Sequence, residues 1–555
     1  MTPNSPTHRP ISASEYRFVA LLTLAVLLVT SLPYAYGYLS APPDKQFMGL
    51  MLDVPDHGQY LSWWRSFQTA LLASNKLTPE PNAPLFFNLL WWTLAQVSRL
   101  TGLGYAPLFQ IFRWVAGASF LWALYRLIAQ LLPETGPRRV AFLLTTFSSG
   151  LGWLLILLKY TLWHGDLPLK LALDVYVAEG NSFLCLLAFP HFTLALTLIA
   201  LTFESIYRWW RAGRKRDILA AGLLALLLGW THTYDLLIIY GVTAVFALAV
   251  WLRDRRFPRR LFWGGLILVP LSCSGAVYSV ILTTLDPLWE QVLAQFANAG
   301  VYTPSPAHLF LLFGFPLGGA LATLIYLLYR RQWSDAHLFL IAWFLAGAAL
   351  NYIPTDFQIH MLSSWQIPLL LLVTVGLYEL TAPSLRRAAI VALLLLVLPT
   401  NLYLWTWRFV DLARHDYPYY LYRDEVAALR WLDGQPDDAA IVLSSLTVGQ
   451  YLPALSGKTA FLAHWAQTVD FYEKQERVAR FFAAGTPDEK RLATVRRFGV
   501  DYIFHGPAER RLGDYDPAHT TWLTPVFTAP QVTLYRVTFA VGASALQPHP
   551  NEREP

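Results

Sequence analysis

Two carboxylates and an imidazole lie close together near the start of the chain. The stretch LDVPDHGQYLSWWR, residues 52–65, contains Asp53, Asp56 and His57. A carboxylate can act as a general base toward an acceptor hydroxyl, or it can bind a divalent cation that neutralises a phosphate. Asp is also a favoured helix N-cap, so a purely structural role for Asp56 is the alternative. The stretch is therefore a candidate for acid–base or metal chemistry.

An aromatic segment follows these acids. Apolar residues recur at spacings of three and four, which predicts an amphipathic helix lying parallel to a membrane surface: Tyr60, Trp63, Trp64, Phe67, Ala70 and Leu71. Pro84 to Arg99 is a second apolar segment, and we interpret it as an interfacial or re-entrant helix. The acids would then lie where water meets the bilayer.

The composition indicates a polytopic membrane protein. The 555 residues are 55% hydrophobic and only 14% charged, and many apolar runs approach 20 residues. Cys185 and Cys273 both fall within hydrophobic segments, so neither a disulfide framework nor redox chemistry is expected. The net charge of +6 is best interpreted through its distribution between loops. No nucleic-acid partner is expected.

Hydrophobic runs predict about eleven transmembrane helices. They lie near residues 18–32, 106–132, 139–162, 182–207, 217–231, 236–252, 261–284, 307–329, 336–352, 364–381 and 388–407. Lys and Arg concentrate in alternate loops, which predicts a cytoplasmic N-terminus by the positive-inside rule. The first run also resembles a signal peptide that could be cleaved after Gly37, but an uncleaved span is the preferred interpretation.

The run 217–252 must turn back inside the membrane. As one helix it would reach about 54 Å, against a hydrocarbon core of about 30 Å. The polar residues 231–235, which include His232 and Asp235, supply the break. Non-helical backbone at that depth is stable only when buried in protein or lining a wet cavity.

Residues after 407 have a different character, with more charge and shorter apolar runs. We expect a transmembrane domain over 1–407 with a first outer loop at 38–105, an extracytoplasmic α/β domain over 408–542, and a disordered tail over 543–555. Helices are expected at 423–432, 469–483 and 488–497, and strands at 440–443, 502–505 and 532–537. The fold class is thus a mainly α membrane bundle with an α/β domain.

Several polar residues on the predicted outer side could bind a substrate, because ionisable groups in or beside spans are costly. Each could instead cap a helix or form an interhelical hydrogen bond. The acidic and polar candidates are Glu179, Asn181, His191, His232, Asp235, Asp356, Gln358 and His360, and the cationic candidates are Arg65, Arg113 and Lys159. The α/β domain adds Gly457, Lys458, His464, Trp465 and Asp470, which could equally form turns and caps.

Signatures of soluble enzymes are missing from the sequence. It contains no Walker loop, no dinucleotide-binding glycine motif after a strand, no H-E-x-x-H and no G-x-S-x-G. Nucleotide-driven chemistry is therefore not expected.

The order of these features resembles the GT-C-type integral membrane glycosyltransferases, specifically their bacterial uncharacterised members. The resemblance is carried by Asp56 to Trp63 after the first span, by Phe357 to His360 with Ile367 to Leu369, and by Leu455 to Lys458 with Ala463 to Ala466. It covers nearly the whole chain, although its motifs are short.

The resemblance implies an inverting hexosyl or pentosyl transferase of the cell envelope. A sugar on a polyprenyl phosphate carrier would pass outside the membrane to a glycan, lipid or protein acceptor. Asp56 first and Asp53 second would be catalytic, either as base or as ligands of a divalent cation such as Mg or Mn. The residues left for substrate binding are His57, Tyr60, Trp64, Arg65, Arg113, Lys159, His191, His232, Asp235, Gln358 and His360. The resemblance leads us to expect Arg near position 360, and His360 stands there.

Two other classes of protein fit parts of the pattern. A polytopic transporter or lipid-linked-oligosaccharide flippase also uses broken helices and polar residues at mid-membrane. No inverted repeat is evident, however, and a large outer α/β domain is unusual in a carrier. The third class is a non-catalytic partner in glycan assembly.

Overall fold

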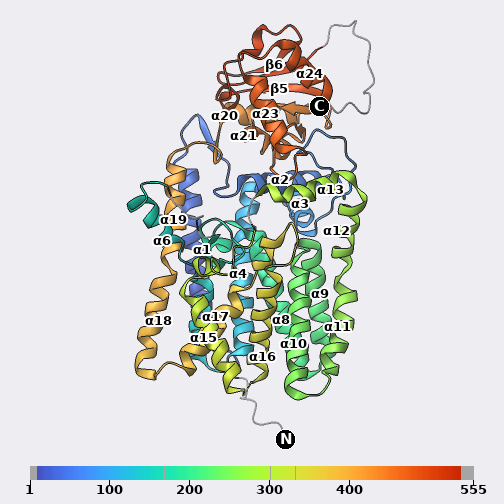
Figure 1. Cartoon of the computed structure of the whole chain (residues 1–555). Helices are drawn as coiled ribbons and strands as arrows, with labels where there is room; N and C mark the ends of the chain where they lie inside the picture. The colour runs from blue at the N-terminus through green and yellow to red at the C-terminus, as the bar shows by residue number, and fades with distance from the viewer. Residues whose placement is uncertain (1–8, 167–170, 172, 300–301, 332, 539–555) are drawn as a thin grey trace. The chain divides into compact units, whose positions relative to one another are not determined.

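The computed structural model describes residues 9–166, 171, 173–299, 302–331 and 333–538 (Figure 1). The expected disordered tail, 543–555, lies outside these residues. Packing groups the chain into two compact units. Unit 1 comprises Met1–Tyr36, Pro107–Ile281 and Val301–Asp411, and unit 2 comprises Gly37–Ala106, Leu282–Gly300 and Leu412–Pro555. The expected outer loop therefore packs with the C-terminal residues, while the domain boundaries drawn from sequence stay predictions.

Unit 1 is helical. Its helices are α1 Ala13–Leu39, α4 Tyr105–Leu131, α5 Thr135–Phe147, α6 Gly152–Thr161, η1 Leu173–Val175, α7 Ser182–Ala188, α8 Pro190–Ala212, α9 Lys215–Thr231, α10 Asp235–Asp254, α11 Arg259–Ser272, α12 Ser274–Leu285, α14 Leu309–Phe313, α15 Phe315–Arg330, α16 Asp335–Leu350, η3 Gln358–Leu362, α17 Gln366–Glu379, α18 Pro383–Val397 and α19 Pro399–Ala413. A few terminal residues of α1, α4, α12 and α19 are assigned to unit 2. Each predicted hydrophobic run coincides with one of these helices or with a broken pair.

Among the described residues, five helices are long and apolar enough to cross a membrane, and up to seven if each bent pair counts as one span. The bent pairs are α5 with α6, at 42°, and α11 with α12, at 51°. Because α15 and α16 are apolar but only 16 residues each, the number of spans stays a prediction.

The predicted break in the run 217–252 is confirmed. Helix α9 ends at Thr231 and α10 begins at Asp235. The Thr233 hydroxyl donates to the Gly229 carbonyl at 2.8 Å, which satisfies a carbonyl at the end of α9.

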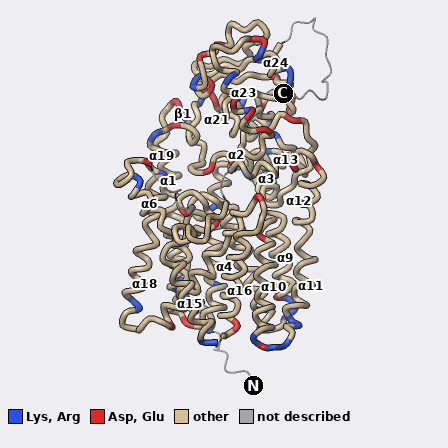
Figure 2. Tube along the Cα trace, in the orientation of Figure 1, with Lys and Arg blue, Asp and Glu red and all other residues tan. Residues whose placement is uncertain are grey.

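Aromatic side chains fill the centre of unit 1. Trp343 on α16 is fully buried, and its ring lies 4.5 Å from Phe203 of α8. Phe339 contacts Phe203 and Phe246, which brings α8, α10 and α16 together. Lys and Arg concentrate at one end of this unit, where the α10–α11 turn lies (Figure 2). This clustering agrees with the loop asymmetry of the sequence.

Unit 2 combines helices with two sheets. Its elements are β1 Lys45–Phe47, α2 Val54–Phe67, α3 Leu89–Thr101, α13 Pro287–Ala294, η2 Gln295–Ala299, β2 Tyr420–Tyr422, α20 Arg423–Asp433, β3 Ile441–Leu443, α21 Leu446–Gly449, α22 Leu452–Ser456, β4 Thr459–Ala460, α23 Phe471–Phe482, α24 Asp488–Phe498, β5 Val500–His505, α25 Pro507–Arg510, η4 Pro517–His519, β6 Leu523–Thr528 and β7 Thr533–Val537.

The larger sheet has the strand order β4-β3-β5-β7-β6. Strand β3 is parallel to β4 and β5, whereas β7 is antiparallel to both β5 and β6. The three predicted helices and three predicted strands of this region are confirmed to within a few residues. Strands β4 and β6 were not predicted, because β4 has two residues and β6 contains Pro525.

Helix α2 differs from the expected surface helix. It ends at Phe67, so Ala70 and Leu71 lie beyond it. Its buried residues include His57, Gly58 and Gln59 as well as the Trp pair, so it is enclosed on nearly every side rather than amphipathic. Helix α3 has 13 residues, about 20 Å, which agrees with a segment that does not span a core of about 30 Å.

Candidate active site

The N-terminus of α2 holds Asp53 and Asp56 in different environments. Asp53 is the N-cap residue, in the left-handed conformation at φ 46° and ψ 55°, and it makes no side-chain cap bond. The chain thus bends into the helix just before Pro55, as proline favours. Asp56 lies in the first turn, where the helix dipole stabilises a carboxylate.

His57 forms two hydrogen bonds to the carbonyl of Asp53 in this turn. Its backbone N–H donates to the Asp53 carbonyl at 3.2 Å, and its Nδ1 lies 2.8 Å from the same oxygen. A carbonyl can only accept, so Nδ1 carries the hydrogen. Asp53 therefore shapes the turn through its main chain.

Asp56 is paired with His464, a residue of the C-terminal α/β region. His464 Nε2 lies 2.9 Å from Asp56 Oδ1. The imidazole is 2% exposed and the carboxylate 27% exposed. The pair thus places a buried ring behind a carboxylate that solvent or a ligand can reach.

The tautomer of His464 follows from its other nitrogen. The backbone N–H groups of Ala466 and Gln467 point at Nδ1, at 2.9 Å and 3.2 Å. Two donors require Nδ1 to be an unprotonated acceptor. The ring hydrogen is therefore on Nε2 and is donated to Asp56.

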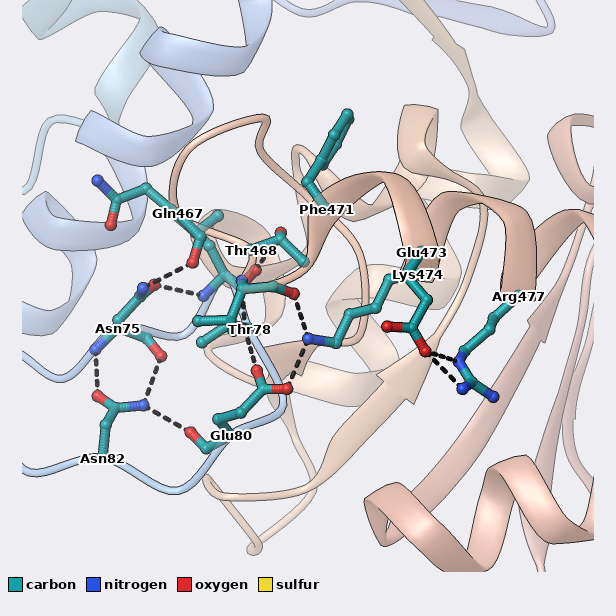
Figure 3. A network of polar contacts seen from close by, with 12 residues as sticks. Asn75, Thr78, Glu80, Asn82, Gln467, Thr468, Phe471, Glu473, Lys474 and Arg477 are labelled. Carbon is teal, nitrogen blue, oxygen red and sulfur yellow. Dashed lines mark hydrogen bonds and ion pairs between the residues drawn. The ribbon is translucent and has the colours of Figure 1, made fainter. Parts of the chain in front are cut away.

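The loop that carries His464 is fixed by the segment Asn75–Asn82 (Figure 3). The Thr468 hydroxyl donates to the Leu77 carbonyl at 2.5 Å and accepts from the backbone N–H of His464 at 3.1 Å. The Asn75 amide donates to the Gln467 carbonyl at 2.9 Å. Lys474 Nζ lies 2.5 Å from Glu80 Oε1, so an ion pair closes the same network.

The short segment 295–298 supports the loop as well. The Gln295 amide donates to the carbonyls of Ala466 and Thr468, at 2.8 Å and 3.0 Å. Asn298 donates to the Trp465 carbonyl at 3.0 Å. Two separate segments, 75–82 and 295–298, therefore hold the loop that positions the imidazole of His464.

Close backbone packing sets the position of α2. A Cβ on Gly58 would lie 2.3 Å from the carbonyl oxygen of Gln450, which is a backbone atom and cannot swing away. Glycine at position 58 thus permits the contact between α2 and the residues before α22.

Aromatic rings surround the same helix. Tyr60 stacks on Trp91 of α3 with centroids 4.6 Å apart. Phe86 lies between Trp63, at 4.0 Å, and Trp289, at 5.1 Å. Trp64 is only 2% exposed, so it shapes a site through packing.

Several buried polar atoms in these segments have no hydrogen-bond partner among the described residues. They are Ser62 Oγ, Trp63 Nε1, Gln450 Oε1 and Gln467 Oε1. Unsatisfied buried polar atoms are costly, and a bound water or a hydroxyl-bearing ligand removes that cost.

The cationic candidates have partners of different kinds. Arg65 forms an ion pair with Asp433. Arg113 is 1% exposed and donates to the hydroxyls of Thr30 and Ser31, at 2.8 Å and 2.5 Å. Lys159 lies over the ring of Tyr160 at 5.6 Å. Lys458 is buried and donates to the Gln435 carbonyl at 2.6 Å, which indicates a structural role.

A second polar group lies within unit 1, around Tyr234. His232 Nδ1 lies 2.6 Å from Asp235 Oδ2, and the Tyr234 hydroxyl lies 2.7 Å from His232 Nε2. His360 stacks on Tyr234 at 4.5 Å and places Nδ1 2.6 Å from Glu179 Oε1. Five residues from three separate segments thus form two carboxylate–imidazole pairs joined by one phenol.

The remaining unit 1 candidates lie beside or outside this group. The His191 ring is 6.3 Å from that of His232 and is 5% exposed. Gln358 donates to the Ile353 carbonyl at 3.1 Å. Asn181 caps α7 and donates to Asn401 at 2.9 Å, which is a structural role.

The described residues contain no group of three or more His, Cys, Asp or Glu side chains arranged to hold a metal ion. Asp53 and Asp56 do not form such a group with other side chains of the described part of the chain. The chemistry below is therefore derived from the side chains alone.

The pairing of Asp56 with His464 was missed at the level of sequence. Both residues were candidates, but in separate groups. The pair is separated by 408 positions, and the only available signal was that both regions concentrate His and Asp beside aromatic residues.

Known proteins resemble this chain in structure rather than in sequence. No family model matches it, and no curated protein matches its sequence. The arabinofuranosyltransferase AftD from mycobacteria superposes with a TM-score of 0.57 at 17% identity, covering 96% of this chain and 41% of AftD. ArnT from Cupriavidus metallidurans, solved with undecaprenyl phosphate, has a TM-score of 0.52 at 13% identity. The match covers 97% of this chain and 100% of ArnT. An oligosaccharyltransferase from Archaeoglobus fulgidus has a TM-score of 0.52 at 13% identity. The match covers 87% of this chain and 68% of the oligosaccharyltransferase.

These likenesses define the class of fold. The chain has the GT-C-type fold of integral membrane glycosyltransferases, with an α/β sheet in its C-terminal region. Together with the candidate spans, they show a multi-pass membrane protein.

Proposed function

We propose that this protein is a membrane glycosyltransferase that moves a sugar from a polyprenyl phosphate carrier to an acceptor on the extracytoplasmic side. The observation that carries the proposal is the Asp56–His464 pair, because it presents a fixed, partly exposed carboxylate in a chain with this fold. The donor class and the side of the membrane rest on the loop asymmetry and on the ligand named for ArnT.

Asp56 is the general base in this proposal. Its carboxylate accepts the proton of the acceptor hydroxyl while that oxygen bonds to the anomeric carbon. The bond from that carbon to the phosphate oxygen breaks, and the polyprenyl phosphate leaves with the electron pair. A single displacement of this kind inverts the anomeric centre.

His464 is a positioning residue for this step. Its Nε2–H donates to Oδ1, and the two backbone amides that donate to Nδ1 fix the orientation of the ring. The imidazole therefore orients the carboxylate. Burial and the supporting loop contacts restrict its rotation, which favours one geometry of the base.

The group around Tyr234 is proposed to bind substrate. It includes His232, Asp235 and His360, whose carboxylate–imidazole pairs can donate to and accept from sugar hydroxyls. Asp235 is fully buried, and its Oδ1 has no hydrogen-bond partner among the residues described. We expect His360→Gln to raise KM for the donor about tenfold with a smaller change in kcat, the effect of one charge-assisted hydrogen bond. The exposed His308→Gln is the control, and equal effects of both substitutions would contradict this role.

Lipid analysis tests the function as a whole. In a strain without this protein, mass spectrometry should find one polyprenyl-linked sugar accumulating while a surface glycan, lipid or protein loses that sugar. Complementation with the full chain should reverse both changes. Unchanged lipid-linked sugars and glycans in that strain would contradict the proposal, and sugar uptake by proteoliposomes without transfer would favour a carrier.

A further inference from the structure

Two adjoining cavities lie in unit 1 between α1, α4, α8 and α9. They have volumes of about 220 Å³ and 340 Å³ and share Gln130 and Arg208 in their walls. All of their lining residues come from the same compact unit. None of them belongs to the sites described above.

The cavities carry an excess of positive charge. Their walls contain Arg126, Arg208, Arg211 and Arg214, against two carboxylates, Glu204 and Asp217. Four guanidinium groups and two carboxylates leave a net charge of about two positive units, since Arg remains protonated in proteins.

The two carboxylates are committed to two of the arginines. Glu204 is 1% exposed and accepts from Arg126 at 2.7 Å and from Arg208 at 3.1 Å. Asp217 lies 3.4 Å from Arg208. Among the described residues, neither Arg211 nor Arg214 has a carboxylate within ion-pair distance, so their charge is available to a ligand.

The rim of the smaller cavity is aromatic. Trp122 lies beneath the guanidinium of Arg126, 4.4 Å from it, and is 43% exposed. Tyr16 on α1 is 52% exposed. Amphipathic rings at the ends of apolar helices are typical of the level of lipid headgroups. Basic pockets between such helices bind anionic headgroups.

We propose that these cavities form a binding site for a phosphate-ester anion, with Arg211 and Arg214 as its main contacts. Guanidinium groups suit phosphate because their paired N–H donors match its oxygens. Glu204 holds Arg126 and Arg208 in fixed positions, which reduces the ordering cost of binding. The anion is the headgroup of an acidic phospholipid or a free phosphate, and the site is independent of the proposed glycosyl transfer.

The test is a binding assay on the purified full chain in detergent, with radiolabelled dihexanoyl-phosphatidylglycerol as probe. Saturable binding is expected, and the Arg211→Gln/Arg214→Gln variant should weaken it at least about tenfold. Arg256→Gln, an exposed arginine in the α10–α11 turn, should leave binding unchanged. If the double variant does not keep the unfolding temperature of the parent chain, the two single variants replace it, each with a smaller loss expected.

Competition identifies the source of the anion. Displacement by inorganic phosphate assigns the site to the phosphate group itself, whereas binding that phosphate does not displace assigns it to the lipid. Either result supports the site. The proposal is overturned if dihexanoyl-phosphatidylcholine binds as tightly as phosphatidylglycerol, if the arginine variants bind like the parent chain, or if Arg256→Gln loses as much affinity as they do.

Discussion

His464 donates a hydrogen bond from Nε2 to Oδ1 of Asp56 across 2.9 Å, and the backbone amides of Ala466 and Gln467 fix which nitrogen donates. A residue of the α/β region thus orients the proposed catalytic base on α2. If Asp56 is the base, as proposed, the C-terminal α/β region contributes a positioning residue to the reaction centre.

Replacement of His464 should distinguish a role in positioning Asp56 from a purely structural role. We expect His464→Ala to lower kcat by about 10- to 100-fold with little change in KM, because the carboxylate loses its orientation. His464→Gln should recover part of kcat by offering an amide donor. The exposed His519→Ala is the control. A fall in unfolding temperature with no change in kcat, or no recovery of kcat in His464→Gln, would indicate a structural role only.

Gly58 should be intolerant of any side chain. A Cβ there meets the Gln450 carbonyl oxygen at 2.3 Å. We therefore expect Gly58→Ala to destabilise the protein by about 1–3 kcal/mol and to lower its unfolding temperature. Gly104→Ala is the matched control, because a Cβ at that position meets no atom within 4 Å. Equal unfolding temperatures for the two variants would show that α2 does not pack as described.

Glu425 should make the stability of the protein depend on pH. Burial raises the pKa of this carboxyl to about 7, and Tyr417 donates to it at 2.6 Å. The folded state therefore binds a proton that the unfolded state has released, and stability falls as pH rises from about 4.5 to about 7. Glu425→Gln should reduce that slope, whereas the exposed Glu489→Gln should not. Parallel pH profiles of unfolding temperature for Glu425→Gln and the parent chain would contradict the raised pKa.

Local features of this fold could be predicted from sequence. The break between α9 and α10 follows from a run too long to be one span, interrupted by Thr231 to Asp235. The strands β3, β5 and β7 follow from short apolar runs. Such features depend on neighbouring residues, so periodicity and turn chemistry are sufficient to find them.

Features that depend on distant contacts could not be predicted. The sequence of α2 looks amphipathic, yet α3 and the residues around Gln450 bury it on both sides. Arg113, a cationic candidate from the sequence, donates to the hydroxyls of Thr30 and Ser31, which lie more than 80 positions earlier in the chain. The link from Asp56 to His464 depends on packing across 408 positions, for which the local pattern contains no signal.

The most direct test of the account compares Asp56→Asn with Asp53→Asn in a transfer assay. The protein would be reconstituted in proteoliposomes with the polyprenyl-linked sugar that accumulates in the deletion strain. Asp56→Asn should lower kcat by at least about 100-fold, since a carboxamide cannot take the acceptor proton. Asp53→Asn should keep much more activity, because Asn tolerates the left-handed conformation and Asp53 shapes the turn through its carbonyl. Transfer by correctly inserted Asp56→Asn at the rate of the parent chain would contradict the central claim.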